Sequence, residues 1–269
     1  ISSVNNTISL GGKAAGVFIL GLLSYNYSYF GMLNAALFLM AFLILIKYKK
    51  LMKAEIGSFK VENTEKISTK RFLKDTIENF KILREIKKIY NFVILFLGMN
   101  FYSSAMFALL LVILVKNDSL LLFGNVAYTI TLLEIVEVVS TIVGGVYQIS
   151  FYKNMSLRNN AILEIILFIM YVGNLLILQN KFILVILTVI IGYFAGISNP
   201  KLDALILQSV PEEKQTSIYS IFSTVITISV PIGTTVILFF ANAISASFAL
   251  YSLLLLLVIV LIYSIKVKQ

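Results

Sequence analysis

Two carboxylates, Glu134 and Glu137, interrupt an otherwise apolar run, TLLEIVEVV, at residues 131–139. An acidic side chain at the centre of a membrane helix costs about 2.5 to 3.5 kcal/mol on insertion scales, so its presence needs a reason. Residues three apart share one helix face, and two like charges in a low-dielectric medium repel each other. We therefore expect at least one of the pair to bind and release a proton near neutral pH. The alternative is a static ion pair that fixes the register of neighbouring helices.

Three further ionisable residues, Lys13, Glu164 and Asp203, fall in or near apolar runs. At a rise of about 1.5 Å per residue, Lys13 lies roughly 14 Å into its run and Glu134 about 20 Å into a run that crosses the other way. Both therefore fall near the midplane of a bilayer. Glu164 lies closer to a helix end, where we expect it to extend to the surface or to pair with Arg158. Asp203 is expected to form an interfacial gate or cap.

The composition indicates that these charges sit on membrane-spanning helices. Hydrophobic residues make up 59% of the 269-residue chain and charged residues only 13%, whereas soluble domains are about 45–50% apolar and about 25% charged. Several apolar runs reach the roughly 20 residues that a transmembrane helix needs. The sequence predicts an all-α, polytopic transmembrane helix bundle with eight spans, at approximately 4–24, 28–46, 90–115, 121–147, 160–178, 182–208, 215–240 and 244–265.

Cysteine and histidine are absent from the sequence. Disulfides, thiolate nucleophiles, imidazole bases and the usual zinc and haem ligands are therefore excluded. HExxH and GxSxG motifs are also missing from the printed sequence. We expect neither an enzyme nor a protein that uses a cofactor or a metal.

The basic residues indicate the orientation of the spans. Thirteen of the 22 basic residues lie between Lys47 and Lys88, against six acidic residues. Because Lys and Arg are enriched in cytoplasmic loops, this segment is predicted to be cytoplasmic, as are both termini. The positive charge is then a topology signal, and no nucleic-acid partner is expected. An integral protein of the cytoplasmic membrane, in a bacterial cell, is the expected location.

Within the basic segment, residues 71–89 place apolar side chains at helical spacing, with basic residues on the other faces. This pattern predicts an amphipathic helix that lies on the inner membrane surface. We favour a structural strap between two helix bundles over a site for a regulatory partner. The chain thus divides into two helices at 1–46, a basic linker at 47–89 and six helices at 90–269.

Three stretches carry a resemblance to a known family. They are residues 5–45, which begin NNTISLGGKAAG, the amphipathic RFLKDTIENFKILRE at 71–85, and GISNPKLDALILQSVPEEKQTSIYSIFSTVITISVPIG at 196–233. Together with the topology, they make the chain similar to macrolide- and drug-efflux-like members of the major facilitator superfamily. On this resemblance the chain covers helices five to twelve of the usual twelve. The first four helices are then missing, and we expect that the chain cannot transport by itself.

The resemblance also implies roles for particular residues. Helices five and eight of the family pack against each other, so Lys13 is expected to face Glu134 or Glu137 as a proton-coupling site or an interface ion pair. The family's seventh and tenth helices border a central cavity. A substrate cavity is therefore expected to be lined by Asn100, Phe101, Tyr102, Ser103, Tyr193, Phe194 and Asn199. Packing without substrate contact is the alternative for each of these side chains.

The expected function is secondary transport by alternating access, with proton-coupled export of a hydrophobic or amphiphilic small molecule. The expected partners are the substrate, protons, the lipid bilayer and the missing N-terminal helices. Two alternatives stay open. One is a receptor, immunity or scaffold protein that has the same fold without transport, and the other is an intramembrane enzyme. The absence of His and Cys argues against the enzyme.

Overall fold

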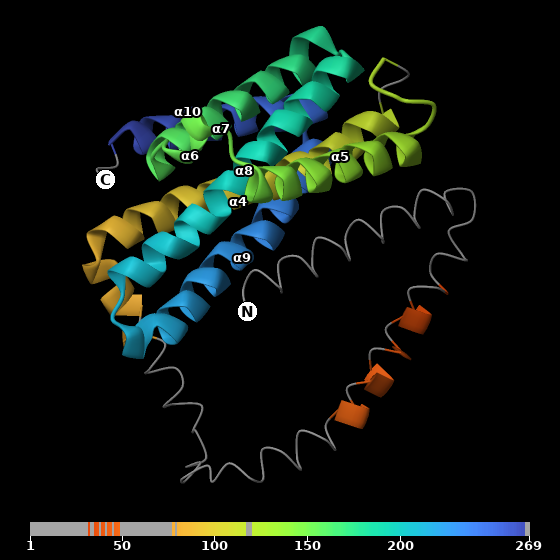
Figure 1. Cartoon of the computed structure of the whole chain (residues 1–269). Coiled ribbons are helices and arrows are strands. Elements are labelled where there is room, and N and C mark those ends of the chain that lie inside the picture. Colours follow the sequence, from red (N-terminus) through yellow and green to blue (C-terminus); the bar gives the residue numbers. More distant parts are fainter. Residues whose placement is uncertain are drawn as a thin grey trace.

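The computed structural model describes residues 80–116 and 120–266, together with short runs between 32 and 48 and residues 77 and 78. This part of the chain is helical and contains no strand longer than a single bridge (Figure 1). Span 4–24 and about half of span 28–46 lie outside the described residues, as does Lys13. The all-α class is confirmed for the part of the chain that is described.

Six helices in the described part are long and apolar enough to cross a membrane. They coincide with the last six predicted spans, so the expectation of a helical membrane protein is confirmed at this level. A short helix α6 precedes α7, and a π-helical turn η1 continues it. The bounds are α4 Lys87–Lys116, α5 Val126–Val146, α6 Ser150–Lys153, α7 Leu157–Gly173, η1 Asn174–Leu178, α8 Lys181–Ser209, α9 Glu212–Ala243 and α10 Ala246–Lys266.

Polar caps determine where the helices begin. The Asn125 side chain accepts a hydrogen bond from the backbone N–H of Tyr128, and Asn180 caps α8 in the same way through Phe182. Such caps satisfy backbone donors that have no partner inside the helix. Helix α5 therefore starts at residue 126 instead of the predicted 121, because Gly124 forms a turn with φ of 83° before the cap. Glycine adopts this left-handed conformation without steric cost.

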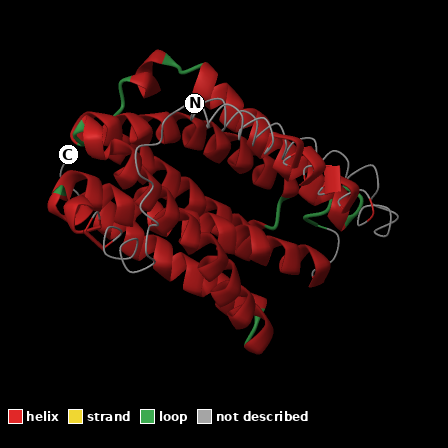
Figure 2. Ribbon diagram, turned by 90° about the horizontal axis from the view of Figure 1, so that it is seen from below, coloured by secondary structure: helices red, strands yellow, loops and turns green. Residues whose placement is uncertain are grey.

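The long helices form one bundle in which two pairs are packed most closely (Figures 1 and 2). Helix α4 runs along α9, and α5 runs along α8. Helix α7 contacts α8 and α10, and α10 also contacts α4 and α9. The bundle is thus built from two closely packed helix pairs, α4–α9 and α5–α8, which α7 and α10 connect.

The first three long helices, α4, α5 and α7, form one triplet, and the last three, α8, α9 and α10, form a second. The pattern of contacts between helices is nearly unchanged when each helix of the first triplet is exchanged with its counterpart in the second. Exchanging α4 with α8, α5 with α9 and α7 with α10 turns the α4–α9 pair into the α8–α5 pair and the α7–α8 contact into the α10–α4 contact. The α7–α10 contact maps onto itself. The α9–α10 contact has no equally close counterpart between α5 and α7. Helix α6 separates those two in sequence, whereas α9 and α10 are joined by only Ile244 and Ser245.

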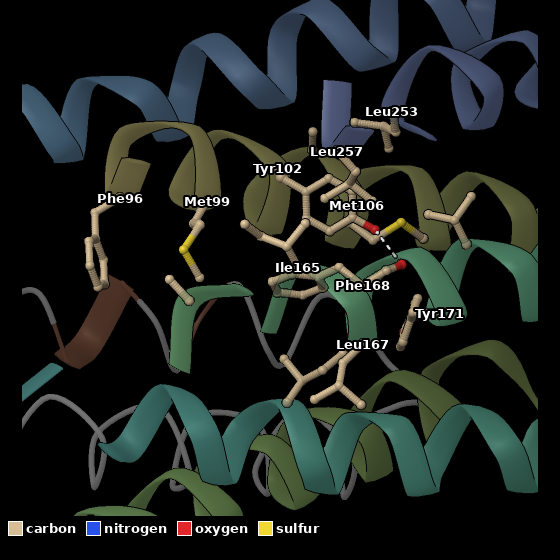
Figure 3. Packing of buried hydrophobic residues seen from close by; sticks show 14 of the residues in the cluster. Phe96, Met99, Tyr102, Met106, Ile165, Leu167, Phe168, Tyr171, Leu253 and Leu257 are labelled. Carbon is tan, nitrogen blue, oxygen red and sulfur yellow. Dashed lines mark hydrogen bonds between the residues drawn. The ribbon is translucent and has the colours of Figure 1, made fainter. Parts of the chain in front are cut away.

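The core of the bundle lies where α4, α7 and α10 meet (Figure 3). Tyr102 of α4 is 1% exposed, and its ring centre lies 4.6 Å from that of Phe168 of α7. The Tyr102 hydroxyl donates to the Phe168 carbonyl at 3.4 Å. Leu253 and Leu257 of α10 line the same space. A buried tyrosine needs a hydrogen-bond partner, and the backbone of α7 provides it.

The inner end of α4 continues from part of the predicted amphipathic segment. Residues 80–85 are helical, a bend occurs at Ile86, and α4 then begins at Lys87 instead of the predicted 90. Leu83 is fully buried, and Ile86 packs against the core, whereas Phe80 is exposed. The end of the linker therefore packs on the bundle. Residues 71–76 lie outside the described part of the chain.

Candidate functional site

The acidic pair lies on one face of α5. The side chain of Glu134 is half-buried and that of Glu137 is exposed on the described part of the molecule. Each of the two makes an interaction through its side chain or backbone. Because Lys13 lies outside the described residues, its pairing with either glutamate stays a prediction.

The backbone of α5 at Glu137 is in direct contact with α8. A Cβ atom on Gly192 would lie 2.8 Å from the carbonyl oxygen of Glu137 and 3.1 Å from the Cβ of Ser140. A Cβ on Gly196 would collide with the carbonyl of Thr141, and one on Gly144 would collide with α8. Glycines allow two membrane helices to approach this closely. The helix that bears both carboxylates is therefore held to α8 by backbone contacts.

One buried hydroxyl group lies within electrostatic range of Glu137. Tyr171 of α7 is buried and lies against Thr188 of α8, close enough to Glu137 for the carboxylate charge to act on its hydroxyl. The Thr188 hydroxyl donates to the Leu184 carbonyl at 2.8 Å. Glu137 is thus exposed, and its charge acts on one buried hydroxyl, that of Tyr171 on α7.

A second glycine crossing joins α4 and α9. A Cβ on Gly233 would collide with the carbonyl of Phe101 and would lie 2.8 Å from the Ser104 hydroxyl oxygen. The single proton of that hydroxyl is shared between the Phe101 carbonyl, at 3.0 Å, and the Val230 carbonyl, at 3.1 Å. Pro231, next to Val230, lies inside α9 and has no N–H to donate. When the two helix triplets are exchanged, this α4–α9 crossing corresponds to the crossing between α5 and α8.

The four predicted cavity residues on α4 differ in their surroundings. The half-buried Asn100 donates from its amide to the Phe96 carbonyl at 3.0 Å, one turn earlier. Tyr102 is enclosed by the core, so in this conformation it packs and lines no open path. Ser103 is exposed, and the half-buried Phe101 takes part in the glycine crossing. Ser103 therefore presents a polar group on the open face of α4.

On α8, Tyr193 is tied to the connection between α5 and α6. Its hydroxyl accepts from the backbone N–H of Ile149 at 3.0 Å and donates to the carbonyl of Tyr147 at 3.3 Å. This aromatic side chain holds the end of α5 in place.

Phe194 is buried and meets the ring of Tyr152 edge-to-face, with ring centres 4.9 Å apart. Asn199 is exposed. Helices α4 and α8 contact each other little, so the predicted cavity residues on the two helices do not form one compact cluster. Their role in binding a substrate stays a prediction.

The two remaining acidic residues are placed differently from the expectation. Glu164 is 3% exposed, and Ser198 of α8 donates to it at 2.5 Å. It therefore neither extends to the surface nor pairs with Arg158. The carboxylate of Asp203 accepts from the Tyr219 hydroxyl of α9 at 3.2 Å, which fits an interfacial cap between two helices.

Several residues at these contacts were not found from the sequence. Gly144 and Gly233 make close backbone contacts, and Ser198 and Asn160 are buried polar groups. The Gly192–Gly196 spacing was the available signal for the α5–α8 crossing. A lone Gly233 gives no such signal, because its contact depends on which helix packs against it.

Comparisons of the chain with family models, with curated proteins and with solved structures find no match.

Proposed function

We propose that the chain belongs to a secondary transporter of the major facilitator type, with eight of the usual twelve spans. It would export a hydrophobic or amphiphilic small molecule in exchange for protons. The sequence resemblance supports this proposal. The main structural support is that the two helix triplets have nearly equivalent contacts.

That equivalence has a geometric consequence in a membrane. A triplet of spans carries the chain from one side of the bilayer to the other, so the second triplet starts on the opposite side from the first. The two triplets therefore have opposite orientations, and the axis that relates them lies in the membrane plane. Inverted repeats of this kind, three helices each, occur within each six-helix half of major facilitator transporters.

The position of the acidic pair supports proton coupling. Glu134 and Glu137 fall near the midplane, on a helix whose outer face is open in the described body. In alternating access, the two halves of a transporter rock about a site at this depth. A Lys13 partner on the other half would separate from the carboxylates and return, so that proton binding is linked to the conformational change.

The experiment compares the double variant Glu134→Gln, Glu137→Gln with the control Glu212→Gln, Glu213→Gln in the complete transporter. The control carboxylates are exposed in the first turn of α9. The transporter is reconstituted into proteoliposomes. Uptake of a radiolabelled macrolide and of a lipophilic dye is then measured with and without an imposed pH gradient.

We expect the double variant to lose gradient-driven uptake at least tenfold while it keeps exchange of labelled for unlabelled substrate. The control should behave as wild type. Gradient-driven uptake that survives the double change would show that coupling at this pair is wrong. A wild-type protein that moves neither probe would favour the receptor or scaffold alternative.

A further inference from the structure

Helices α7 and α8 carry buried oxygen-bearing side chains that are distinct from the acidic pair of α5. Glu164 is 3% exposed, Ser198 is 1% exposed and Asn160 is fully buried. The Ser198 hydroxyl donates to Glu164 Oε1 at 2.5 Å. The predicted topology puts this cluster near the inner ends of the two helices.

Asn160 is a further buried polar side chain of α7. It precedes Glu164 by four residues, so the two side chains share one face of α7. Helices α7 and α8 run antiparallel, with Glu164 against Ser198 and Tyr171 against Thr188. Neither the oxygen nor the nitrogen of the Asn160 amide has a hydrogen-bond partner. Buried side-chain amides nearly always have one, so this orphaned group points to a ligand.

Among the described residues, the carboxyl group of Glu164 has no basic side chain as a hydrogen-bond partner. The nearest basic side chain along α8 is Lys201, but its ammonium donates to the carbonyls of Tyr152 and Met155 at 2.9 and 2.6 Å. An ionised carboxylate offers about four acceptor sites, and here Ser198 occupies one. A buried carboxylate in this state needs a positive charge beside it.

We propose that Asn160, Glu164 and Ser198 form a buried site for one monovalent cation, bound as Na⁺ or as a proton. Hard cations take oxygen ligands, and the three side chains offer a carboxylate, an amide oxygen and a hydroxyl. A proton would reside on Glu164, whose carboxylic O–H would then donate to the amide oxygen of Asn160. The site does not depend on the proposed transport function, and it lacks any residue of the Lys13, Glu134 and Glu137 group.

Other charged groups lie on the elements that pack around the site, and they must be held constant in a test of pH dependence. They are Glu134 and Glu137 of α5, Arg158 of α7, Lys181, Lys201 and Asp203 of α8, and Lys266 of α10, together with Lys153 in the neighbouring α6. All remain unchanged in the variants below.

The experiment uses the purified chain in detergent micelles and has two arms. In the first, binding of radioactive Na⁺ is measured directly, with K⁺ and choline as competitors at constant ionic strength. In the second, infrared difference spectra between low and high pH record the band of a protonated carboxyl group. Both arms compare wild type with Glu164→Gln, Asn160→Leu and Ser198→Ala.

Matched controls are available next to the site. Asn159, the exposed neighbour of Asn160, is changed to Leu, and the exposed Glu212 is changed to Gln. Circular dichroism verifies that each variant is folded, and Ser198→Ala keeps the test decisive should Glu164→Gln fail to fold.

If the site binds Na⁺, the wild-type protein binds one equivalent of Na⁺ that choline does not displace. Glu164→Gln abolishes this binding, and Asn160→Leu and Ser198→Ala weaken it at least tenfold. If the site binds a proton, a carboxyl band appears in wild type, disappears in Glu164→Gln and shifts in Asn160→Leu and Ser198→Ala. The Asn159→Leu and Glu212→Gln controls match wild type in both arms. The proposal is overturned if wild type binds no Na⁺ and shows no carboxyl band that Glu164→Gln removes.

Discussion

The substitution Gly196→Ala tests whether backbone contact holds α5 to α8. The new methyl group would lie 2.9 Å from the amide nitrogen of Gly145 and closer still to the carbonyl of Thr141, whereas ordinary contact begins at 3.4 Å. The helices must separate by at least 0.5 Å, the difference between 3.4 and 2.9 Å. A gap of about 0.5 to 1 Å forfeits a quarter to a half of each dispersion contact.

The net effect follows from two opposing contributions. Overpacking costs about 1–3 kcal/mol, and alanine gains about 1 kcal/mol over glycine in helix propensity. Because the obstacle is backbone and cannot rotate away, we expect the upper part of the range, a net destabilisation of about 1–2 kcal/mol. Lipid offers no hydrophobic gain on helix association, so this lost packing has no compensation.

The assay is thermal unfolding of the purified protein, followed by far-ultraviolet circular dichroism because the chain has no tryptophan. The midpoint of Gly196→Ala should fall by roughly 2–8 °C. Gly173→Ala is the control, because its Cβ would have nothing within 4 Å. The control should be stabilised by about 0.5–1 kcal/mol. An equal rise in midpoint for both variants would refute close contact at the crossing.

Two further changes test the core and a cap by the same unfolding assay. Tyr102→Phe removes only a 3.4 Å hydrogen bond to Phe168 and should cost at most about 1 kcal/mol, whereas Tyr102→Ala should cost about 3–5 kcal/mol; equal losses would mean that the ring is not packed. Asn180→Ala removes the acceptor for the backbone N–H groups of Phe182 and Ile183 and should cost about 1 kcal/mol, while Asn180→Asp should retain stability; a cost for both variants would count against the cap.

The sequence predicts the helices well because bilayer thickness dictates the length of an apolar run. The last six spans agree with the structure to within a few residues, apart from the start of α5. That start depends on the turn at Gly124 and the cap at Asn125. Hydropathy does not distinguish an apolar turn from the apolar first turn of a helix, so Leu121 to Phe123 were assigned to the span.

The surroundings of single polar residues were harder to predict. The sequence predicts Glu164 near the surface because it indicates how far the residue lies from the helix end. It does not indicate which helix packs against that face. Ser198, 34 positions later in the sequence, meets it only because α7 and α8 pack antiparallel in this register. Pattern arguments place a residue on a face of its own helix, and they do not identify the partner across the interface.

The two glycine crossings have a mechanical consequence. At Gly196 and Gly233, the nearest obstacle to an added side chain is the backbone of the facing helix, which cannot rotate away. The seams along α7 and α10 consist of side chains that can repack. A bilayer thinner or thicker than the hydrophobic length forces spans to tilt. A change in tilt would then alter the angle between two rigid helix pairs, α5–α8 and α4–α9. Glu137 lies in the middle of α5 and would move with the α5–α8 pair.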